Sequence, residues 1–212
     1  MNVPVATGGI FAEQLERIVA GLVRDGLAIE TAFLSPAQVD GLLREARQSW
    51  AAGRFHAAGV GRGQAQQRQE SIRGDHVLWL DEHAPADVAL ADYLSRMDAL
   101  QQTLNQSLYL GLFELETHFA VYPPGSYYRC HVDNFRGAGE RRVTTILYLN
   151  PEWQPEHGGA LRIYLEGEHG AYLDVPPLGG TLVTFLSERY YHEVLPTTVD
   201  RISLTGWFRR RP

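Results

Sequence analysis

The sequence predicts an α+β domain in which helices pack against an antiparallel sandwich or barrel of short strands. Three observations support this: the chain has 212 residues, its first half shows helical periodicity, and its second half alternates between apolar and polar residues. A core usually stays undivided below roughly 250 residues. We therefore expect one domain over residues 1–212, with mainly helical support at 1–110 and a strand-rich core at 111–208.

Helices account for most of the expected first half. Apolar residues recur there every three or four positions in three stretches, which is the spacing of an amphipathic helix. Ser35 and Pro36 provide a cap residue and a first-turn proline for the second helix. In chain order, the expected elements are a helix over 11–23, a strand over 26–29, a helix over 36–52, a strand over 76–80 and a helix over 88–108.

The segment Gly53–Gly74 lacks apolar periodicity and is rich in glycine, glutamine and arginine. We expect it to form a long mobile loop or ribbon. A stretch of this length without regular structure is uncommon inside a compact domain and tends to be functional.

From Glu114 onward the hydrophobic period changes to strict alternation, which is typical of half-buried strands. Clusters of glycine and proline separate the alternating stretches and predict the turns between them. The expected strands cover 114–122, 142–149, 160–164, 180–185 and 201–208.

Composition excludes several classes of function. A net charge of −6 argues against binding to nucleic acid or to an anionic membrane. The chain contains no lysine, which excludes a Schiff-base or phosphate-loop lysine. The single cysteine, Cys130, cannot form an internal disulfide. No stretch has the roughly 20 apolar residues of a membrane span, and no signal peptide is evident. We expect a cytoplasmic protein.

Three residues of the second half could hold a metal ion. Residues two apart in a strand share a face, so His131 and Asp133 can present a nitrogen and an oxygen to one point. His192, from a distant strand, would add a second imidazole. Two imidazoles and one carboxylate on one side of a metal leave other positions open, as in non-haem Fe(II) oxygenases. Each residue taken alone could equally be a structural hydrogen-bonding residue.

Arg201 opens an apolar strand, where an unpaired guanidinium would be costly to bury. A small dicarboxylate could dock one end on Arg201 while its other end chelates the metal. An internal salt bridge to an Asp or Glu is the alternative.

Residues 113–208 resemble the 2-oxoglutarate- and Fe(II)-dependent prolyl hydroxylases. Among these they resemble most a bacterial form of the domain that hydroxylates proline in the hypoxia-inducible transcription factor. The motifs that carry the resemblance are Tyr122-Pro123, Tyr128 to Asn134, Tyr148-Leu149-Asn150, Trp153, Gly158 to Tyr164, His192-Glu193-Val194 and Arg201 to Phe208.

The resemblance implies a double-stranded β-helix (a jelly-roll, or cupin-like fold) and the use of Fe(II), 2-oxoglutarate and O₂, with ascorbate as the reductant. It makes His131, Asp133 and His192 the iron ligands and the catalytic centre, and Arg201 the partner of the 2-oxoglutarate C5 carboxylate. The further residues implied at the co-substrate pocket are Tyr122, Tyr128, Tyr148, Leu161, Thr205 and Trp207.

The implied reaction is hydroxylation of C4 of a prolyl residue in a partner protein, with release of succinate and CO₂, by a monomer. The segment 53–74 would close over the peptide. Peptide contacts are expected from Arg62, Arg68, Arg141, Arg142 and Trp207.

Two alternatives stay open. The same cofactors could serve a hydroxylase of a small molecule or a free amino acid, or the scaffold could be a non-catalytic module that senses a metal or a 2-oxo acid. The remaining histidines, His118 among them, are expected at surface or structural positions.

Overall fold

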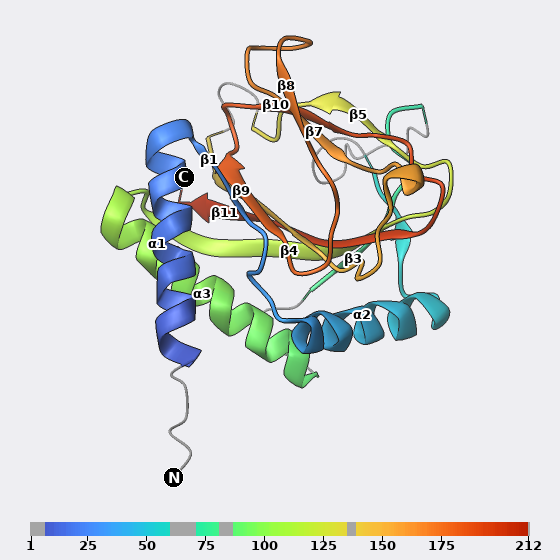
Figure 1. Ribbon diagram of the computed structural model, residues 1–212, viewed down its shortest axis with the longest axis horizontal. Coiled ribbons are helices and arrows are strands. Elements are labelled where there is room, and N and C mark those ends of the chain that lie inside the picture. Colours follow the sequence, from blue (N-terminus) through green and yellow to red (C-terminus); the bar gives the residue numbers. More distant parts are fainter. Residues whose placement is uncertain (1–6, 60–70, 81–86, 135–138, 212) are drawn as a thin grey trace.

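The computed structural model describes residues 7–59, 71–80, 87–134 and 139–211. Within these ranges the chain forms three α-helices, a seven-stranded antiparallel sheet and a four-stranded antiparallel sheet. The helices lie on one side of the larger sheet and the smaller sheet lies on the other (Figure 1). This confirms the predicted α+β class and the jelly-roll fold implied by the resemblance.

The helices begin at the expected caps. In α2 (Pro36–Ala51), the Ser35 hydroxyl accepts a hydrogen bond from the backbone N–H of Gln38, and the Gln38 side chain accepts one from the N–H of Ser35. This reciprocal pair satisfies two backbone donors that the helix leaves free. The Asp87 carboxylate caps α3 (Val88–Leu108) by accepting from the backbone donors of Ala89 and Leu90.

The helices bury apolar side chains against the outer face of the seven-stranded sheet. Met97, Leu100 and Leu104 of α3 are fully buried there, in one cluster with residues of α1 (Thr7–Asp25) and α2. Burying a side chain of this size stabilises the fold by about 1.5–3 kcal/mol. None of the described helices is both long and apolar enough to cross a membrane.

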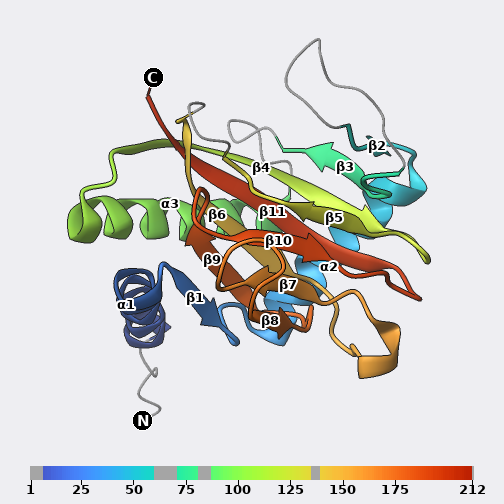
Figure 2. The same cartoon turned by 90° about the horizontal axis from the view of Figure 1, so that it is seen from above.

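The seven-stranded sheet has the order β1-β9-β6-β11-β4-β3-β2, and the four-stranded sheet has the order β5-β10-β7-β8. Seen from above, the smaller sheet lies over the β11, β6 and β9 part of the larger one (Figure 2). The strands are β1 (Leu27–Glu30), β2 (His56–Ala57), β3 (His76–Trp79), β4 (Leu112–Tyr122), β5 (Tyr128–His131), β6 (Arg141–Tyr148), β7 (Leu161–Tyr164), β8 (Tyr172–Val175), β9 (Leu182–Leu186), β10 (Tyr191–Val194) and β11 (Arg201–Arg210).

The central strands β4 and β11 separate the apolar core from the side that carries function. They pair with Tyr122 opposite Arg201. Because side chains alternate along a strand, Phe119 and Leu204 face the helices. The residues that alternate with these point to the opposite face. They include Tyr122 and Arg201, and they face the four-stranded sheet, where a cavity lies.

Three strands of the four-stranded sheet, β5, β8 and β10, are absent from the strands predicted by alternation. Each contains four residues, the same length as β1, β3 and β7, which were predicted, so length does not explain the difference.

The segment predicted as a loop or ribbon over 53–74 contains a short strand near its first end and partly lies outside the described residues. His56 and Ala57 form β2, which pairs with β3. At the other end, Arg73 forms a β-bridge with Tyr128. Residues 60–70, which include Arg62 and Arg68, are not among those described.

Candidate metal and co-substrate site

His131, Asp133 and His192 come together between the two sheets. His131 ends β5 and pairs with His192 of β10, and Asp133 follows two residues after His131. The Nε2 atom of His131 lies 3.7 Å from Oδ1 of Asp133, and the Nε2 atom of His192 lies 3.6 Å from Oδ2. One ligand atom from each residue lies within 4.8 Å of the other two, so one metal ion can contact all three.

Backbone carbonyls orient both imidazole rings. Nδ1 of His131 lies 2.8 Å from the carbonyl oxygen of Arg129, and Nδ1 of His192 lies 3.1 Å from that of Tyr190. When Nδ1 donates to these carbonyls, the lone pair is on Nε2, the nitrogen that faces Asp133. Burial, and the nearby His192, lower the pKa of His131 to about 3, so its ring is neutral at physiological pH.

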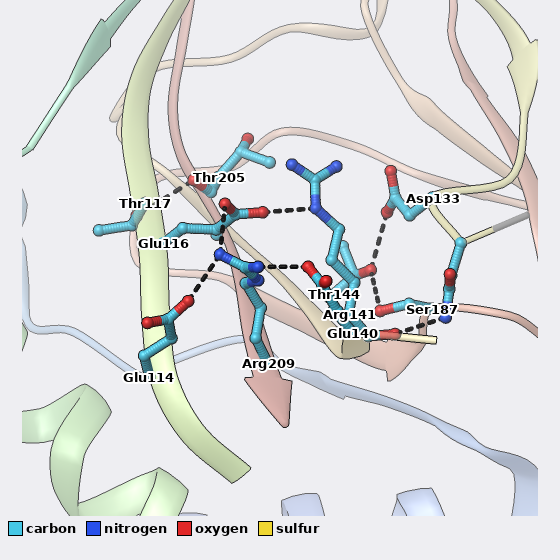
Figure 3. Close-up of polar contacts among 12 residues, drawn as sticks. Glu114, Glu116, Thr117, Asp133, Glu140, Arg141, Thr144, Ser187, Thr205 and Arg209 are labelled. Carbon is cyan, nitrogen blue, oxygen red and sulfur yellow. Dashed lines mark hydrogen bonds and ion pairs between the residues drawn. The ribbon is translucent and has the colours of Figure 1, made fainter. Parts of the chain in front are cut away.

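Two hydroxyl groups hold the Asp133 carboxylate. Thr144 of β6 donates a hydrogen bond of 2.7 Å to Oδ2 of Asp133, and the Thr144 and Ser187 hydroxyls lie 2.9 Å apart (Figure 3). Burial alone would raise the pKa of Asp133, but the two imidazoles and the Thr144 hydrogen bond outweigh it and lower the pKa. The carboxylate is therefore ionised and fixed in position before any metal arrives.

Arg201 is buried without a carboxylate beside it. It is 1% exposed, its Nε donates to the carbonyl of Gly159 at 2.8 Å, and its Nη2 has no hydrogen-bond partner within the described chain. The hydroxyl of Tyr148 is also buried and unpartnered there, and its ring centre lies 5.0 Å from the guanidinium carbon. Two buried donors without acceptors indicate an external anion, because leaving these hydrogen bonds unmade is costly.

The tyrosines beside Arg201 remain protonated. Burial raises the pKa of Tyr148 to about 12 and also raises the pKa of Tyr122, whose ring centre is likewise 5.0 Å from the guanidinium carbon. A protonated hydroxyl can donate to a carboxylate, so Tyr148 and Arg201 together suit one carboxylate group.

A cavity of ≈ 760 Å³ connects the metal ligands to Arg201. It is large enough for a small diacid together with part of a second ligand. Tyr148 lies beside Arg201 but does not itself line the cavity. The other residues expected at this pocket do line it, namely Tyr122, Tyr128, Leu161, Thr205 and Trp207.

Charged residues line one side of the cavity near Trp207. Arg141 donates from Nε to Glu116, and its guanidinium carbon lies 3.7 Å from the centre of the Trp207 ring. Arg209 pairs with Glu114, Glu116 and Glu140 (Figure 3). In the same view the terminal nitrogens of Arg141 point away from Glu116.

Arg142 does not line the cavity, unlike its neighbour Arg141. Its side chain pairs with Glu188 at 3.7 Å. Adjacent residues of a strand point to opposite faces, so Arg141 and Arg142 lie on different sides of β6. The peptide contact expected from Arg142 stays a prediction.

Sequence reasoning missed a contact that links Arg73 to the metal ligands. Arg73 forms an ion pair with the buried Asp75, and its guanidinium carbon lies 4.1 Å from the Tyr128 ring centre. Tyr128 in turn stacks on His131, with ring centres 3.7 Å apart. No motif marks Arg73, because Tyr128 and His131 lie far away in the sequence.

His118 was also missed, and it is buried in the cavity wall. Its ring packs against the rings of Trp79 and Trp207, with centre distances of 4.6 and 5.4 Å, and the two indole centres lie 6.3 Å apart. Burial, assisted by Arg73 and Arg141, lowers the pKa of His118 to about 3. Its position on the same strand face as Tyr122 was the one available signal.

The lowered pKa of His118 predicts acid sensitivity of the metal-free protein. In the unfolded chain this imidazole binds a proton near its ordinary pKa of 6.5, whereas in the folded chain it does so only near pH 3. The free energy of unfolding therefore falls as the pH drops from about 6.5 towards 3. Melting curves at pH 7 and pH 5 should show a smaller acid-induced drop in Tm for His118→Phe than for wild type. Equal drops would contradict the assignment.

Comparison with known proteins places the chain among oxygenases. A family model described as the 2OG-Fe(II) oxygenase superfamily matches residues 117–209. Egl nine homolog 1 of Homo sapiens is 32% identical over 201 residues, which cover 92% of this chain and 46% of that protein. The chain thus spans about half the length of this relative.

Two solved structures are similar over nearly the whole chain. A Pseudomonas putida prolyl-4-hydroxylase is 43% identical with a TM-score of 0.84, covering 93% of this chain and 100% of that one. A Trichoplax adhaerens prolyl hydroxylase, in complex with a hypoxia inducible factor oxygen degradation domain peptide fragment, is 26% identical with a TM-score of 0.85, covering 97% and 94%.

Proposed function

Because the chain belongs to the 2OG-Fe(II) oxygenase superfamily, we propose that it hydroxylates C4 of a prolyl residue in a partner protein, with release of succinate and CO₂. The single observation that supports this most is the cavity that connects His131, Asp133 and His192 to the unpaired Arg201. The identity to the Pseudomonas prolyl-4-hydroxylase supports proline as the target.

His131, Asp133 and His192 would hold Fe(II), because two imidazoles and one carboxylate suit a non-haem iron that keeps positions open. When bound, the iron supplies the site at which O₂ is activated together with the 2-oxo acid. The protein contributes geometry: Thr144 holds the carboxylate, and the carbonyls of Arg129 and Tyr190 fix both rings.

Arg201 and Tyr148 would bind the C5 carboxylate of 2-oxoglutarate. The unpaired Nη2 and the unpaired hydroxyl are the donors that this group needs, and both are buried away from competing water. Leu161, fully buried, and Tyr122 flank this end of the cavity and exclude solvent. The pocket thus matches a diacid at one end and leaves the other end to the substrate.

The substrate peptide would enter beside Trp207 and Arg141. The terminal nitrogens of Arg141 would bind backbone carbonyls of the peptide, and Trp207, which lines the same side of the cavity, would contact the peptide beside them. Arg62 and Arg68 stay predicted peptide contacts, since they lie outside the described residues.

We further infer that ascorbate keeps the iron reduced, and that the protein acts as a cytoplasmic monomer. The support for ascorbate is the requirement for Fe(II) in this superfamily. The support for the cytoplasm is the likeness to a bacterial hydroxylase, together with a lone cysteine that suits a reducing compartment.

A capture experiment tests the proposed function and finds the target. Wild-type protein loaded with Mn(II) and an inert 2-oxo acid analogue is used to capture proteins from cell lysate. Captured proteins are then incubated with active enzyme, and hydroxyproline is mapped by mass spectrometry. We expect a hydroxyprolyl residue that is absent when Asp133→Ala replaces the active enzyme. Hydroxylation of free proline but of no captured protein would contradict the proposal and indicate a small-molecule substrate.

A further inference from the structure

We propose that His118 is a substrate-positioning residue whose imidazole hydrogen-bonds the backbone of the bound peptide next to the reacting proline. This inference rests on the proposed function and adds the group that recognises the peptide backbone. It concerns a residue that neither binds the metal nor contacts the co-substrate end of the cavity.

His118 lies on the inward face of β4 between the two ends of the site. It is four residues from Tyr122 on that face and pairs with Thr205 of β11, whereas Tyr122 pairs with Arg201. On its other side it pairs with Trp79 of β3. His118 therefore lies between Arg201, at the co-substrate end, and Trp207 with Arg141, where the peptide would enter.

Two tryptophans fix the plane of the imidazole. The Trp207 ring stacks on it at an interplanar angle of 28°, and the Trp79 ring lies tilted against it at a centre distance of 4.6 Å. The two indoles also contact each other, with ring centres 6.3 Å apart, so the three rings form one packed cluster. The stack orients the ring before a ligand binds, which reduces the entropy lost on binding.

The imidazole has an unused hydrogen-bonding group. Its Nδ1 is buried and has no partner within the described chain, although the side chain is only 3% exposed. Such a group destabilises the free protein and usually has an explanation in function. A ligand that supplies the missing partner would remove this penalty.

The chemistry around His118 favours a neutral partner. The two cations near it are already matched, since Arg73 pairs with Asp75 and Arg141 with Glu116. Burial keeps the imidazole uncharged, so it offers one donor and one acceptor. A peptide bond carries both complementary groups, N–H and C=O, and no charge that would have to be desolvated.

Kinetics on peptides with one central proline and randomised flanking residues test this role. His118→Phe keeps an aromatic ring against both indoles but removes both nitrogens. We expect it to raise the peptide KM by about 3- to 10-fold, the loss of roughly one hydrogen bond, with kcat changed less than about twofold. His118→Asn should restore much of the affinity, because its amide places a polar atom near the position of Nδ1. His169→Phe, at an exposed site, is the matched control and should behave as wild type.

A second measurement needs no variant that might fail to fold. In wild-type protein labelled with ¹⁵N-histidine and loaded with Zn(II), the His118 ring resonances should shift when the same peptides are added. Unmoved resonances, or an unchanged peptide KM in His118→Phe, would overturn the inference and leave the proposed function intact. A loss of 2-oxoglutarate binding in His118→Phe would also overturn it. If wild type hydroxylates no peptide, the proposed function fails and this inference fails with it.

Discussion

Replacing Arg201 with leucine is expected to raise the KM for 2-oxoglutarate by roughly 100- to 1,000-fold. The reason is that the C5 carboxylate of the bound 2-oxoglutarate would lose the guanidinium that pairs with it in the buried cavity. Arg201 is 1% exposed and its Nη2 is unpaired, so the protein has no acceptor of its own for that nitrogen within the described chain. Calorimetric titration of the Mn(II)-loaded protein with 2-oxoglutarate measures the corresponding loss of 2-oxoglutarate affinity directly.

The same substitution should not destabilise the ligand-free protein. Leucine removes a buried charge that lacks a carboxylate, so the Tm without 2-oxoglutarate should stay the same or rise. Arg162→Leu is a matched control, because Arg162 pairs with Asp174 on the outer face of the four-stranded sheet, away from the cavity. Unchanged 2-oxoglutarate affinity in Arg201→Leu would show that the diacid binds elsewhere.

Replacing Asp133 with alanine is expected to abolish turnover, with a loss of at least about 1,000-fold, since a bound metal contributes several kcal/mol to the reaction. Asp133 supplies the one negatively charged ligand among the three residues, and its oxygens lie within 3.7 Å of both histidines. Removing it leaves two neutral nitrogens to bind a divalent cation.

Metal analysis after dialysis checks the cause of this loss. Wild type should retain close to one ion per chain when loaded with Mn(II), and Asp133→Ala should retain almost none. Asp174→Ala, which removes a carboxylate from an outer-face pair, is the control and should retain the ion. Stoichiometric metal in Asp133→Ala would contradict the assignment of the ligands.

Two of the metal ligands were predicted from the period of a strand, in which residues two apart share a face. In the structure β5 ends at His131 and Asp133 lies two residues past its end, yet their ligand atoms still converge. The partner His192 could not be found this way, since its pairing with His131 joins residues 61 positions apart. His192 was proposed as the third ligand to complete a set of two imidazoles and one carboxylate, and the resemblance to the prolyl hydroxylases supports the same role.

The helices and long strands were predictable for a similar reason, since caps and periodicity are local. Strand β8 was not predicted by alternation, although it pairs with its near neighbour β7. Strands β5 and β10 were missed as well, and β10 pairs with residues of β5 and β7 that are distant in the chain. The same holds for His118. Whether a histidine on an alternating strand faces solvent or a cavity is decided by Trp79 and Trp207, which come from two other strands.

The most direct test of the account is the origin of the oxygen atom in the product. A captured prolyl substrate is incubated with the wild-type enzyme, Fe(II), 2-oxoglutarate and ¹⁸O₂, and both hydroxyproline and succinate are examined by mass spectrometry. The account predicts one heavy oxygen in the hydroxyproline and one in the succinate, in equal amounts, with neither product formed by Asp133→Ala. Hydroxyproline that forms without 2-oxoglutarate would contradict it. So would hydroxyproline whose new oxygen atom comes from water and not from ¹⁸O₂.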